Sequence, residues 1–328
     1  MALAFVTGAT GFIGSRVTRI LLEKGYQVRL LVRPGADTRL IAGLPVEQVS
    51  GDLRDPRSLE NLLAGCEQLY HVGALYTYWT RNPAEIYATN VEGTRNILTE
   101  AERAGVQRIV YTSSVATLGR RKDGLPADET TPSQLEEMIG DYKRSKFLAE
   151  EVAKGFAARG LPVIIVNPST PVGTGDIKPT PTGRIVLDFI TGRMPAYVDT
   201  GLNIVDVDDV AVGHWLAAER GQPGERYILG NQNLTLAQIF QILSDITGRP
   251  APRHKIPHSA ALLFAAIDTT WARFLPSHVP RATFDTVRLS KKPMYFCSER
   301  AVHELGFPQT DVREALAKSV RWFQTNFA

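Results

Sequence analysis

Three polar side chains of the 328-residue sequence could carry out acid–base chemistry together: Tyr142, Lys146 and Ser114. Tyr142 and Lys146 are four residues apart in a helical pattern, so both would lie on one face of the helix. A neighbouring ammonium favours the phenolate and lowers the pKa of a tyrosine, which could then exchange a proton with a substrate oxygen. Ser114 follows a strand-like run and could hydrogen-bond the same oxygen. The simpler interpretation of the Tyr-x-x-x-Lys spacing is a surface tyrosine beside a salt-bridging lysine.

A glycine-rich turn joins the first strand-like run to the first helical pattern. Its glycines have a GxxGxxG spacing: Gly8, Gly11 and Gly14. In that order, they would permit a tight turn, the close approach of a pyrophosphate, and the packing of helix on strand. The helix would direct its free N–H groups at the phosphates, so Thr10, Phe12 and Ile13 join the predicted cofactor site. The alternative is an ordinary strand-to-helix turn with incidental glycines.

An arginine follows the second strand-like run, where the adenine ribose of a dinucleotide is expected. Arg33 comes directly after Leu30-Leu31-Val32, no carboxylate is present in the run, and Arg39 lies in the next turn. An acidic residue here favours NAD, whereas an arginine accommodates the 2′-phosphate of NADP. We therefore expect NADP(H), with NAD(H) as the alternative cofactor; a solvated surface arginine is the simpler explanation.

Strand-like and helical runs alternate through the first two-thirds of the chain. The predicted strands are 2–7, 26–32, 46–50, 68–72, 108–113 and 163–167, and the predicted helices are 11–24, 83–104 and 141–159. This alternation predicts an α/β protein with a doubly wound parallel sheet, the Rossmann fold. The dinucleotide-binding domain is expected over residues 1–167 and part of 168–230.

The second part of the chain has a different texture. Residues 167–183 are rich in proline and glycine and predict an irregular loop. Short strands at 202–207 and 227–229 follow, with helices that begin near Asp208, Leu236, Ser259 and Asp311. We expect a smaller, mostly helical C-terminal substrate lobe, formed by about 168–200 and by 231–328.

Several classes of protein are not expected. Cys66 and Cys297 stand apart, and no His pair has the spacing of metal ligands, so we predict neither a disulfide framework nor a metal site. The N-terminus shows no basic stretch followed by an apolar run and a cleavage site. The longest uncharged apolar run, 260–267, is far shorter than the roughly 20 residues that span a bilayer. We expect a cytoplasmic protein, at most peripheral to a membrane.

The net charge of +3 is small but unevenly distributed. Residues 249–300 contain nine Lys and Arg side chains against three carboxylates. No aromatic-interleaved groove accompanies this charge, so we expect no nucleic-acid partner. The excess favours an anionic or amphiphilic small-molecule substrate, or contact of residues 258–292 with an anionic membrane surface. 

The same region contains the most apolar helical pattern of the sequence. Its large side chains have the spacing of a helical face: Leu262, Leu263, Phe264, Ile267, Trp271 and Phe274. The simpler interpretation is a helix that packs on the substrate lobe or on a homodimer partner, and the alternative is a membrane-surface contact.

Two further polar features have structural explanations. His214 lies early in a helical pattern beside Trp215, where a packed or capped histidine is favoured over a ligand or base. Asp208 is predicted to cap the helix that follows it, with Asp209 in the first turn.

Together, the glycine turn, the serine and the Tyr-x-x-x-Lys pair resemble the extended short-chain dehydrogenase/reductases. The resemblance covers essentially the whole chain and is closest to the hopanoid-associated sugar epimerases. The sequence is also similar to dihydroflavonol reductases and 3β-hydroxysteroid dehydrogenases, which share Val32-Arg33. The segments that carry the resemblance are 51–53, 71–74, 90–94, 142–150, 167–173, 178–184 and 205–210.

The resemblance implies roles for particular residues. Ser114, Tyr142 and Lys146 would be catalytic. Besides the glycine turn, Arg33, Tyr142 and Lys146, the implied cofactor residues are Asp52, Leu53, Val72, Gly73, Ala74, Asn90, Thr112, Asn167, Pro168 and Ser169. Lys178 and Arg184 flank a Pro/Thr loop and could bind an anionic substrate group together with Ser114 and Tyr142, or be ordinary surface residues.

The resemblance implies an NAD(P)-dependent enzyme that transfers hydride at a carbinol or ketone carbon. A sugar or sugar-linked substrate related to hopanoid biosynthesis is one expectation, and an NADPH-dependent ketone reductase of the dihydroflavonol-reductase type is the alternative. The catalytic residues cannot separate the two, because both reactions use them identically. The NADP preference favours reduction, whereas the epimerase resemblance favours epimerisation. A non-catalytic dinucleotide sensor is the third reading, disfavoured because such proteins tend to lose the tyrosine.

Overall fold

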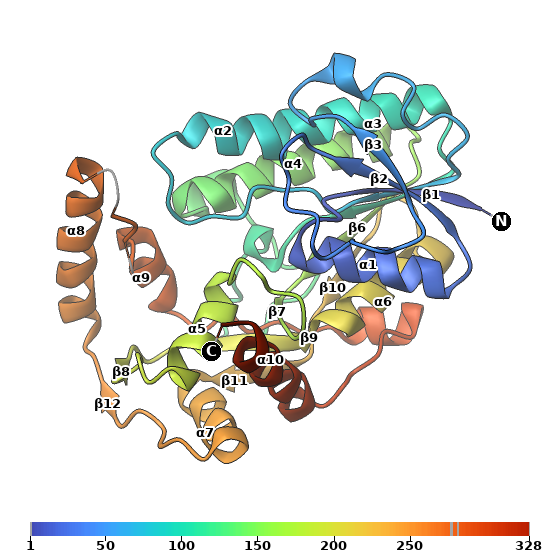
Figure 1. The fold of residues 1–328 in the computed structure, drawn as a ribbon. Helices are drawn as coiled ribbons and strands as arrows, with labels where there is room; N and C mark the ends of the chain where they lie inside the picture. Colours follow the sequence, from blue (N-terminus) through green and yellow to red (C-terminus); the bar gives the residue numbers. More distant parts are fainter. Residues whose placement is uncertain (1, 276–277, 281, 328) are drawn as a thin grey trace.

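A seven-stranded parallel sheet lies at the centre of the structure, a computed structural model that describes residues 2–275, 278–280 and 282–327. Its strands have the order β10-β6-β5-β4-β1-β2-β3 (Figure 1). Their bounds are β1 Leu3–Thr7, β2 Gln27–Val32, β3 Glu47–Ser50, β4 Gln68–His71, β5 Arg108–Thr112, β6 Val163–Pro168 and β10 Arg226–Leu229. Every neighbouring pair is parallel. The predicted fold class is therefore confirmed.

Helices cover both faces of this sheet. The helices α1 (Phe12–Glu23) and α6 (Val207–Arg220) bury apolar side chains on one face, and α3 (Gly93–Ala104) and α4 (Gly140–Ala158) do so on the other. Successive strand residues point to opposite faces, so Val6 packs under the first pair and Phe5 under the second. This two-sided burial explains why β1 and β6 are nearly continuous apolar runs.

The helix predicted over 83–104 is interrupted. It consists of α2 (Pro83–Tyr87), a π-helical turn at Ala88–Glu92, and α3. The wider turn includes Asn90, which is buried. Such π-turns within α-helices are frequent at functional sites because they redirect one side chain.

The prediction of an irregular loop over residues 167–183 is wrong in two segments. Thr170–Val172 forms a short strand, β7, and Pro181–Ile190 forms the helix α5. Proline is tolerated in the first turn of a helix, where its missing N–H would have no partner in the helix. Thr180 caps α5 by accepting a hydrogen bond from the Gly183 N–H. The prolines therefore begin a helix here.

The rest of the chain forms the smaller lobe. A three-stranded sheet has the order β11-β9-β7, and a two-stranded sheet pairs β12 with β8. The bounds are β8 Ala196–Tyr197, β9 Gly201–Asp206, β11 Gln232–Thr235, β12 His254–Lys255, α7 Leu236–Thr247, α8 His258–Phe274, α9 Phe284–Ser290 and α10 Val312–Phe327. The helices α5, α7 and α10 share one apolar core with β9. In Figure 1, α8 forms the left edge of the molecule, next to α9.

Short helical turns complete the description. The 3₁₀ turns are Pro56–Leu59, Val115–Thr117 and Leu135–Glu137, and a second π-helical turn is Ala301–Leu305. The last of these packs Ala301 and Leu305 under the large sheet beside α6. A short piece of the C-terminal region thus contributes to the core around the large sheet.

Candidate active site

The predicted cofactor residues gather at one edge of the large sheet. Residues 8–14, 33, 52–53, 72–74, 112 and 167–169 end or follow β1, β2, β3, β4, β5 and β6 respectively. In a parallel sheet all these carboxyl ends lie at the same edge, and dinucleotides bind in the crevice outside it. Asn90, Tyr142 and Lys146 reach this edge from the helical layer formed by the first π-turn and α4.

The three glycines of the turn have different constraints. Gly8 has a φ of +73°, and a Cβ there would lie 2.6 Å from the Cα of Gly73. A Cβ on Gly14 would collide with the Gly8 carbonyl, whereas one on Gly11 would meet only that carbonyl, at 3.3 Å. Gly8 and Gly14 are therefore required by the packing of the chain itself. Gly11, at the N-cap of α1, offers no side-chain cap, so the first N–H groups of this helix remain available to phosphate.

A buried histidine connects the ends of β1 and β4. His71 Nδ1 lies 2.7 Å from Thr7 Oγ1 and His71 Nε2 lies 3.0 Å from Thr94 Oγ1. Thr7 Oγ1 accepts from the Gly73 N–H, and Thr94 Oγ1 donates to the Asn90 carbonyl. This pattern assigns the proton of a neutral imidazole to Nε2. Burial, and then the Lys146 ammonium, lower the pKa of His71 to about 3.

Asn90 holds the segment that follows β4. Its Oδ1 accepts from the Leu75 N–H at 2.7 Å, and its Nδ2 donates to the Leu75 carbonyl and to Ser145 Oγ. Asn90 thereby joins the π-turn, the segment after Ala74 and α4.

Tyr142, Lys146 and Ser114 lie together at the end of β5. Lys146 is buried, and its Nζ donates to the Thr112 carbonyl at 2.8 Å and to Tyr111 Oη at 3.2 Å. Burial lowers the pKa of Lys146 to about 8, with Glu150 acting in the opposite direction. Contrary to the expected lowering, the pKa of Tyr142 is raised by burial and by Tyr78, while the Ser114 hydroxyl opposes the shift. 

Two tyrosines that the motifs did not indicate pack against Tyr142. The ring centroids of Tyr76 and Tyr78 lie 4.7 and 5.5 Å from that of Tyr142. Tyr76 remains 43 % exposed, so it forms an accessible aromatic wall beside the Tyr142 phenol. The signal in the sequence is the run Tyr76-Thr77-Tyr78-Trp79 directly after the predicted cofactor segment 71–74.

Glu150 is a further positioning residue. Its Oε2 accepts hydrogen bonds from Ser113, Thr117 and Asn167, and its Oε1 pairs with Arg226 at 3.1 Å. Burial opposes its ionisation, but Lys154, the two hydroxyls and Arg226 together lower its pKa. This buried carboxylate fixes the segment around Ser114.

Two buried polar atoms at the end of β6 have no partner among the described residues. They are Asn167 Oδ1 and Ser169 Oγ. Unpaired buried polar atoms are rare, so they mark a place where a ligand completes the hydrogen bonding. By the resemblance, this is the carboxamide end of the cofactor. The residues present therefore fit a nicotinamide dinucleotide: glycine turn and helix N-terminus for the phosphates, and these two atoms at the opposite end.

The end of β2 carries several charges. Arg33 is exposed, and its guanidinium donates no hydrogen bond to a described residue. Its charge, after that of Arg54, contributes to lowering the pKa of Asp52. Side-chain and backbone hydrogen bonds from Arg39, and to a smaller extent the charge of Lys178, lower the pKa of Asp37 to about 2. Lys178 thus lies near the expected ribose.

The loop before α5 crosses the crevice. Gly175 lies close to Phe12 of α1 and to Leu40. The buried Asp176 accepts from Thr180 N and Oγ1, and burial raises its pKa to about 6. Asp176 also acts on Tyr76, because its charge is among the contributions that raise the pKa of that tyrosine, after desolvation, Tyr78 and Tyr142. Arg184 is exposed on α5 and its charge acts on Asp176.

His214 and the aspartates of α6 are structural. The His214 Nδ1–H donates to the Val210 carbonyl and its Nε2 accepts from Thr112 Oγ1, while burial lowers its pKa to about 4. The predicted N-cap was wrong: Asp206 caps α6 by accepting from the Asp208 N–H. Asp208 instead pairs with Arg16 of α1. No group of three or more potential metal ligands exists among the described residues.

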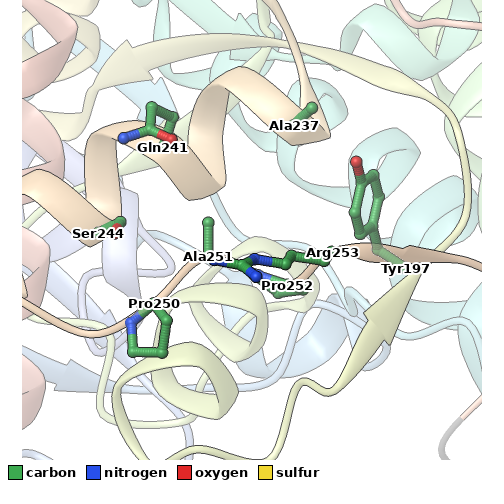
Figure 2. Close-up of a pocket in the computed structure, with 8 residues that line it drawn as sticks. All are labelled: Tyr197, Ala237, Gln241, Ser244, Pro250, Ala251, Pro252 and Arg253. Atoms are coloured by element: carbon green, nitrogen blue, oxygen red, sulfur yellow. The ribbon is translucent and has the colours of Figure 1, made fainter.

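A separate shallow pocket of about 400 Å³ lies on the lobe. Figure 2 shows it between α7, which contributes Ala237, Gln241 and Ser244, and the chain around Pro252. None of the predicted site residues lines it. The pocket and the sheet edge are therefore separate places in the fold.

The crevice, its glycine turn and the Ser–Tyr–Lys group define a Rossmann-fold oxidoreductase. The chain belongs to the NAD dependent epimerase/dehydratase family, which it matches over residues 4–230. The resemblance to the extended short-chain dehydrogenase/reductases is thereby confirmed, and the chain is an enzyme of a family that binds NAD(P). 

Similar proteins carry several different names. A Synechocystis sp. protein that bears the name dihydroflavonol 4-reductase is 48% identical over 98% of this chain and 94% of its own length. Sterol demethylase protein B of Methylococcus capsulatus is 39% identical over 97% of both chains. The crystal structure of gox2253 is 49% identical, with a TM-score of 0.89 and coverage of 100% and 99%. A nucleoside-diphosphate-sugar epimerase from Pseudomonas aeruginosa has 27% identity, a TM-score of 0.82 and coverage of 99% and 98%.

Proposed function

We propose that the enzyme is an NADP(H)-dependent reductase of a ketone on an amphiphilic, largely apolar substrate. The observation that carries the proposal is the packing of Tyr76 and Tyr78 against Tyr142. An aromatic wall beside the proton donor suits an apolar ring system better than a polyhydroxylated sugar. The raised pKa of Tyr142 keeps its phenol protonated at neutral pH, as an acid for ketone reduction must be.

In this proposal the residues of the chain bind and polarise the ketone. Ser114 Oγ donates a hydrogen bond to the substrate oxygen, and Tyr142 Oη transfers its proton to that oxygen. Lys146, still ammonium at neutral pH because its pKa is about 8, stabilises the phenolate that results. A nicotinamide cofactor in the crevice would supply the hydride. Tyr76 and Tyr78 exclude water from the phenol.

NADP(H) is supported by the charges near the end of β2. Arg33, Arg39 and Lys178 lie around the expected ribose, and Arg33 has no ion pair among the described residues. A cation at this position accommodates a 2′-phosphate. Two similar proteins bear the names dihydroflavonol 4-reductase and sterol demethylase protein B, and both names also fit an apolar scaffold that carries an oxygen.

Epimerisation of a sugar or of a sugar-linked, hopanoid-related substrate is the second candidate function. It is favoured by the family description and by the likeness to the Pseudomonas aeruginosa epimerase. Arg184 and Lys178 would then bind an anionic substrate group. The same three catalytic residues would serve this reaction.

Measuring how much nucleotide the reaction consumes separates ketone reduction from epimerisation. Purified enzyme is incubated with NADPH or NADH and with cyclic ketones of sterol and flavonoid type, and nucleotide loss and alcohol formation are measured together. The proposal predicts one alcohol for each NADPH consumed, and exchangeable bound nucleotide. Tightly retained NAD, with conversion of a nucleotide sugar and no net nucleotide loss, would establish epimerisation instead.

A further inference from the structure

The helix α8 presents a large apolar face to solvent. Toward the protein it packs the small side chains Ala261, Ala265 and Ala272. The large side chains lie on the opposite side and are 53 to 79 % exposed: Leu263, Phe264, Ile267, Trp271 and Phe274. Figure 1 shows this helix at the edge of the molecule.

This arrangement reverses the usual order of a surface helix. Ordinarily the large apolar side chains face the core and polar ones face water. The exposed apolar surface continues beyond the helix at Leu275, Val279 and Phe284. Contiguous apolar patches of this kind mark contact with another molecule or with a membrane.

Positive charge accompanies the apolar face. Residues 258–292 carry five Lys and Arg side chains against two carboxylates. Arg273, Arg288, Lys291 and Lys292 are exposed, and none of them forms an ion pair with a described residue. Two copies of the chain joined through this face would bring these cations together, whereas anionic headgroups would neutralise them.

The C-terminal end of α8 is joined to the active site. Arg81 donates hydrogen bonds to the Ala272 and Leu275 carbonyls, at 2.8 and 2.7 Å. Arg81 follows Tyr76 and Tyr78 in the same connection, residues 72–82, which packs its tyrosines against Tyr142. The exposed face and the aromatic wall of the site are therefore parts of one connected region.

We propose that α8 lies flat in the interface of an anionic membrane. At 17 residues it is about 25 Å long, and no helix among the described residues is long and apolar enough to cross a bilayer. The apolar side chains would enter the headgroup–acyl boundary, and the four cations would contact lipid phosphates. The connection 72–82 would then adjoin the lipid from which an amphiphilic ketone could be taken. Only this last step rests on the proposed function.

Vesicle sedimentation tests the membrane contact without any turnover. Full-length protein is mixed with vesicles of phosphatidylcholine alone or with added phosphatidylglycerol. The expected result is strong partition onto the anionic vesicles, weaker partition onto the neutral ones, and weakening by salt. The double variant L263E/I267E should reduce partition by at least about tenfold, and K291Q/K292Q by about fivefold per lysine.

Matched controls lie outside the patch. Leu125 is 59 % exposed and Arg57 is exposed, so L125E and R57Q repeat the chemical changes at other surface sites. Both should bind anionic vesicles like the unchanged protein. Thermal unfolding of every variant checks the fold, and the replaced side chains bury little surface.

Two outcomes would overturn the proposal. One is no binding to anionic vesicles, or binding that L263E/I267E leaves intact. The other is a dimer in light scattering that L263E/I267E converts to a monomer, without vesicle binding by the unchanged protein. That result would assign the face to a second copy. Ketone reduction is measured separately, so loss of membrane binding and failure of the reductase proposal remain distinguishable.

Discussion

The sheet edge and the outer part of the lobe differ in how their side chains are paired. At the sheet edge, Lys146, Glu150 and His71 are buried and each has two or more hydrogen-bond partners. In the outer lobe, α8 buries alanines and leaves Trp271 and Phe274 exposed. Fixed geometry is needed where protons move, whereas the apolar surface of α8 remains open to a molecule outside the chain.

The largest expected effect is at Tyr142, the proposed proton donor. Tyr142→Phe removes the proton donor but keeps the ring that packs on Tyr76 and Tyr78. We expect kcat for ketone reduction to fall about 10³-fold, within the usual range for general acid catalysis, with NADPH affinity nearly unchanged. Steady-state kinetics and fluorescence titration of NADPH measure the two quantities. Unchanged turnover would show that the sheet edge is not where the proton moves.

Replacing Glu150 tests how much the buried ion pair at the sheet edge contributes to stability, compared with an exposed pair in the lobe. Glu150→Gln leaves Arg226 without its buried carboxylate, so the free energy of unfolding should fall by about 3 kcal/mol. The matched change in the lobe is Asp199→Asn, which breaks the exposed pair with Lys255 and should cost less than about 1 kcal/mol. Urea unfolding measures both. Equal losses of unfolding free energy would show that the buried ion pair at the sheet edge stabilises the protein no more than the exposed pair in the lobe.

Acid should destabilise the nucleotide-binding half through its buried histidines. His71 and His214 have folded pKa values of about 3 and 4, below the usual 6.5. The unfolded chain therefore binds more protons below pH 6.5, and the free energy of unfolding falls as the pH drops through that window toward 4. At pH 5 each histidine should account for about 2 kcal/mol. Asp176 acts in the opposite direction, because burial raises its pKa to about 6.

A difference between variants isolates the histidine effect. His214→Gln should lower stability at pH 7 but show a smaller further loss from pH 7 to 5, by about 2 kcal/mol. His254→Gln, the same change at an exposed position of the lobe, is the matched control. Urea unfolding at several pH values measures this. If the stability of His214→Gln falls with pH as steeply as that of the unchanged protein, His214 is not a neutral imidazole in the folded state.

The central sheet could be predicted from the sequence because helices cover both of its faces and bury its strands. Buried parallel strands are apolar on both faces, so β1 and β6 are visible as short apolar runs. The loop 167–183 was mispredicted because proline normally interrupts helices, yet Pro181 occupies the first turn of α5, where it is tolerated. Helix α9 was missed because it is only seven residues long and has little periodicity.

Motif spacing indicated the sheet edge as the candidate site, but it did not indicate every contact between distant segments. Tyr142 and Lys146 share one helix turn, but the contact of Tyr76 with Tyr142 joins segments far apart in the chain. The cap of α6 illustrates the same limit, because Asp206 and Asp208 are equally suitable by type. The backbone decides between them: Asp206 has the extended conformation of an N-cap, whereas Asp208 already lies in the first turn of α6.

The Lys178→Gln variant tests whether this side chain belongs to the cofactor site or to the substrate site. Its charge acts on Asp37 near the expected ribose, whereas that of Arg184 acts on Asp176. Lys178→Gln should lower the ratio of kcat/KM for NADPH over NADH by about tenfold, since one cation–phosphate contact is lost. Arg184→Gln should change this ratio by less than about twofold. If Lys178→Gln instead raises KM for the ketone and leaves the nucleotide ratio unchanged, the loop before α5 belongs to substrate recognition. The boundary between the two regions would then lie nearer to the glycine turn.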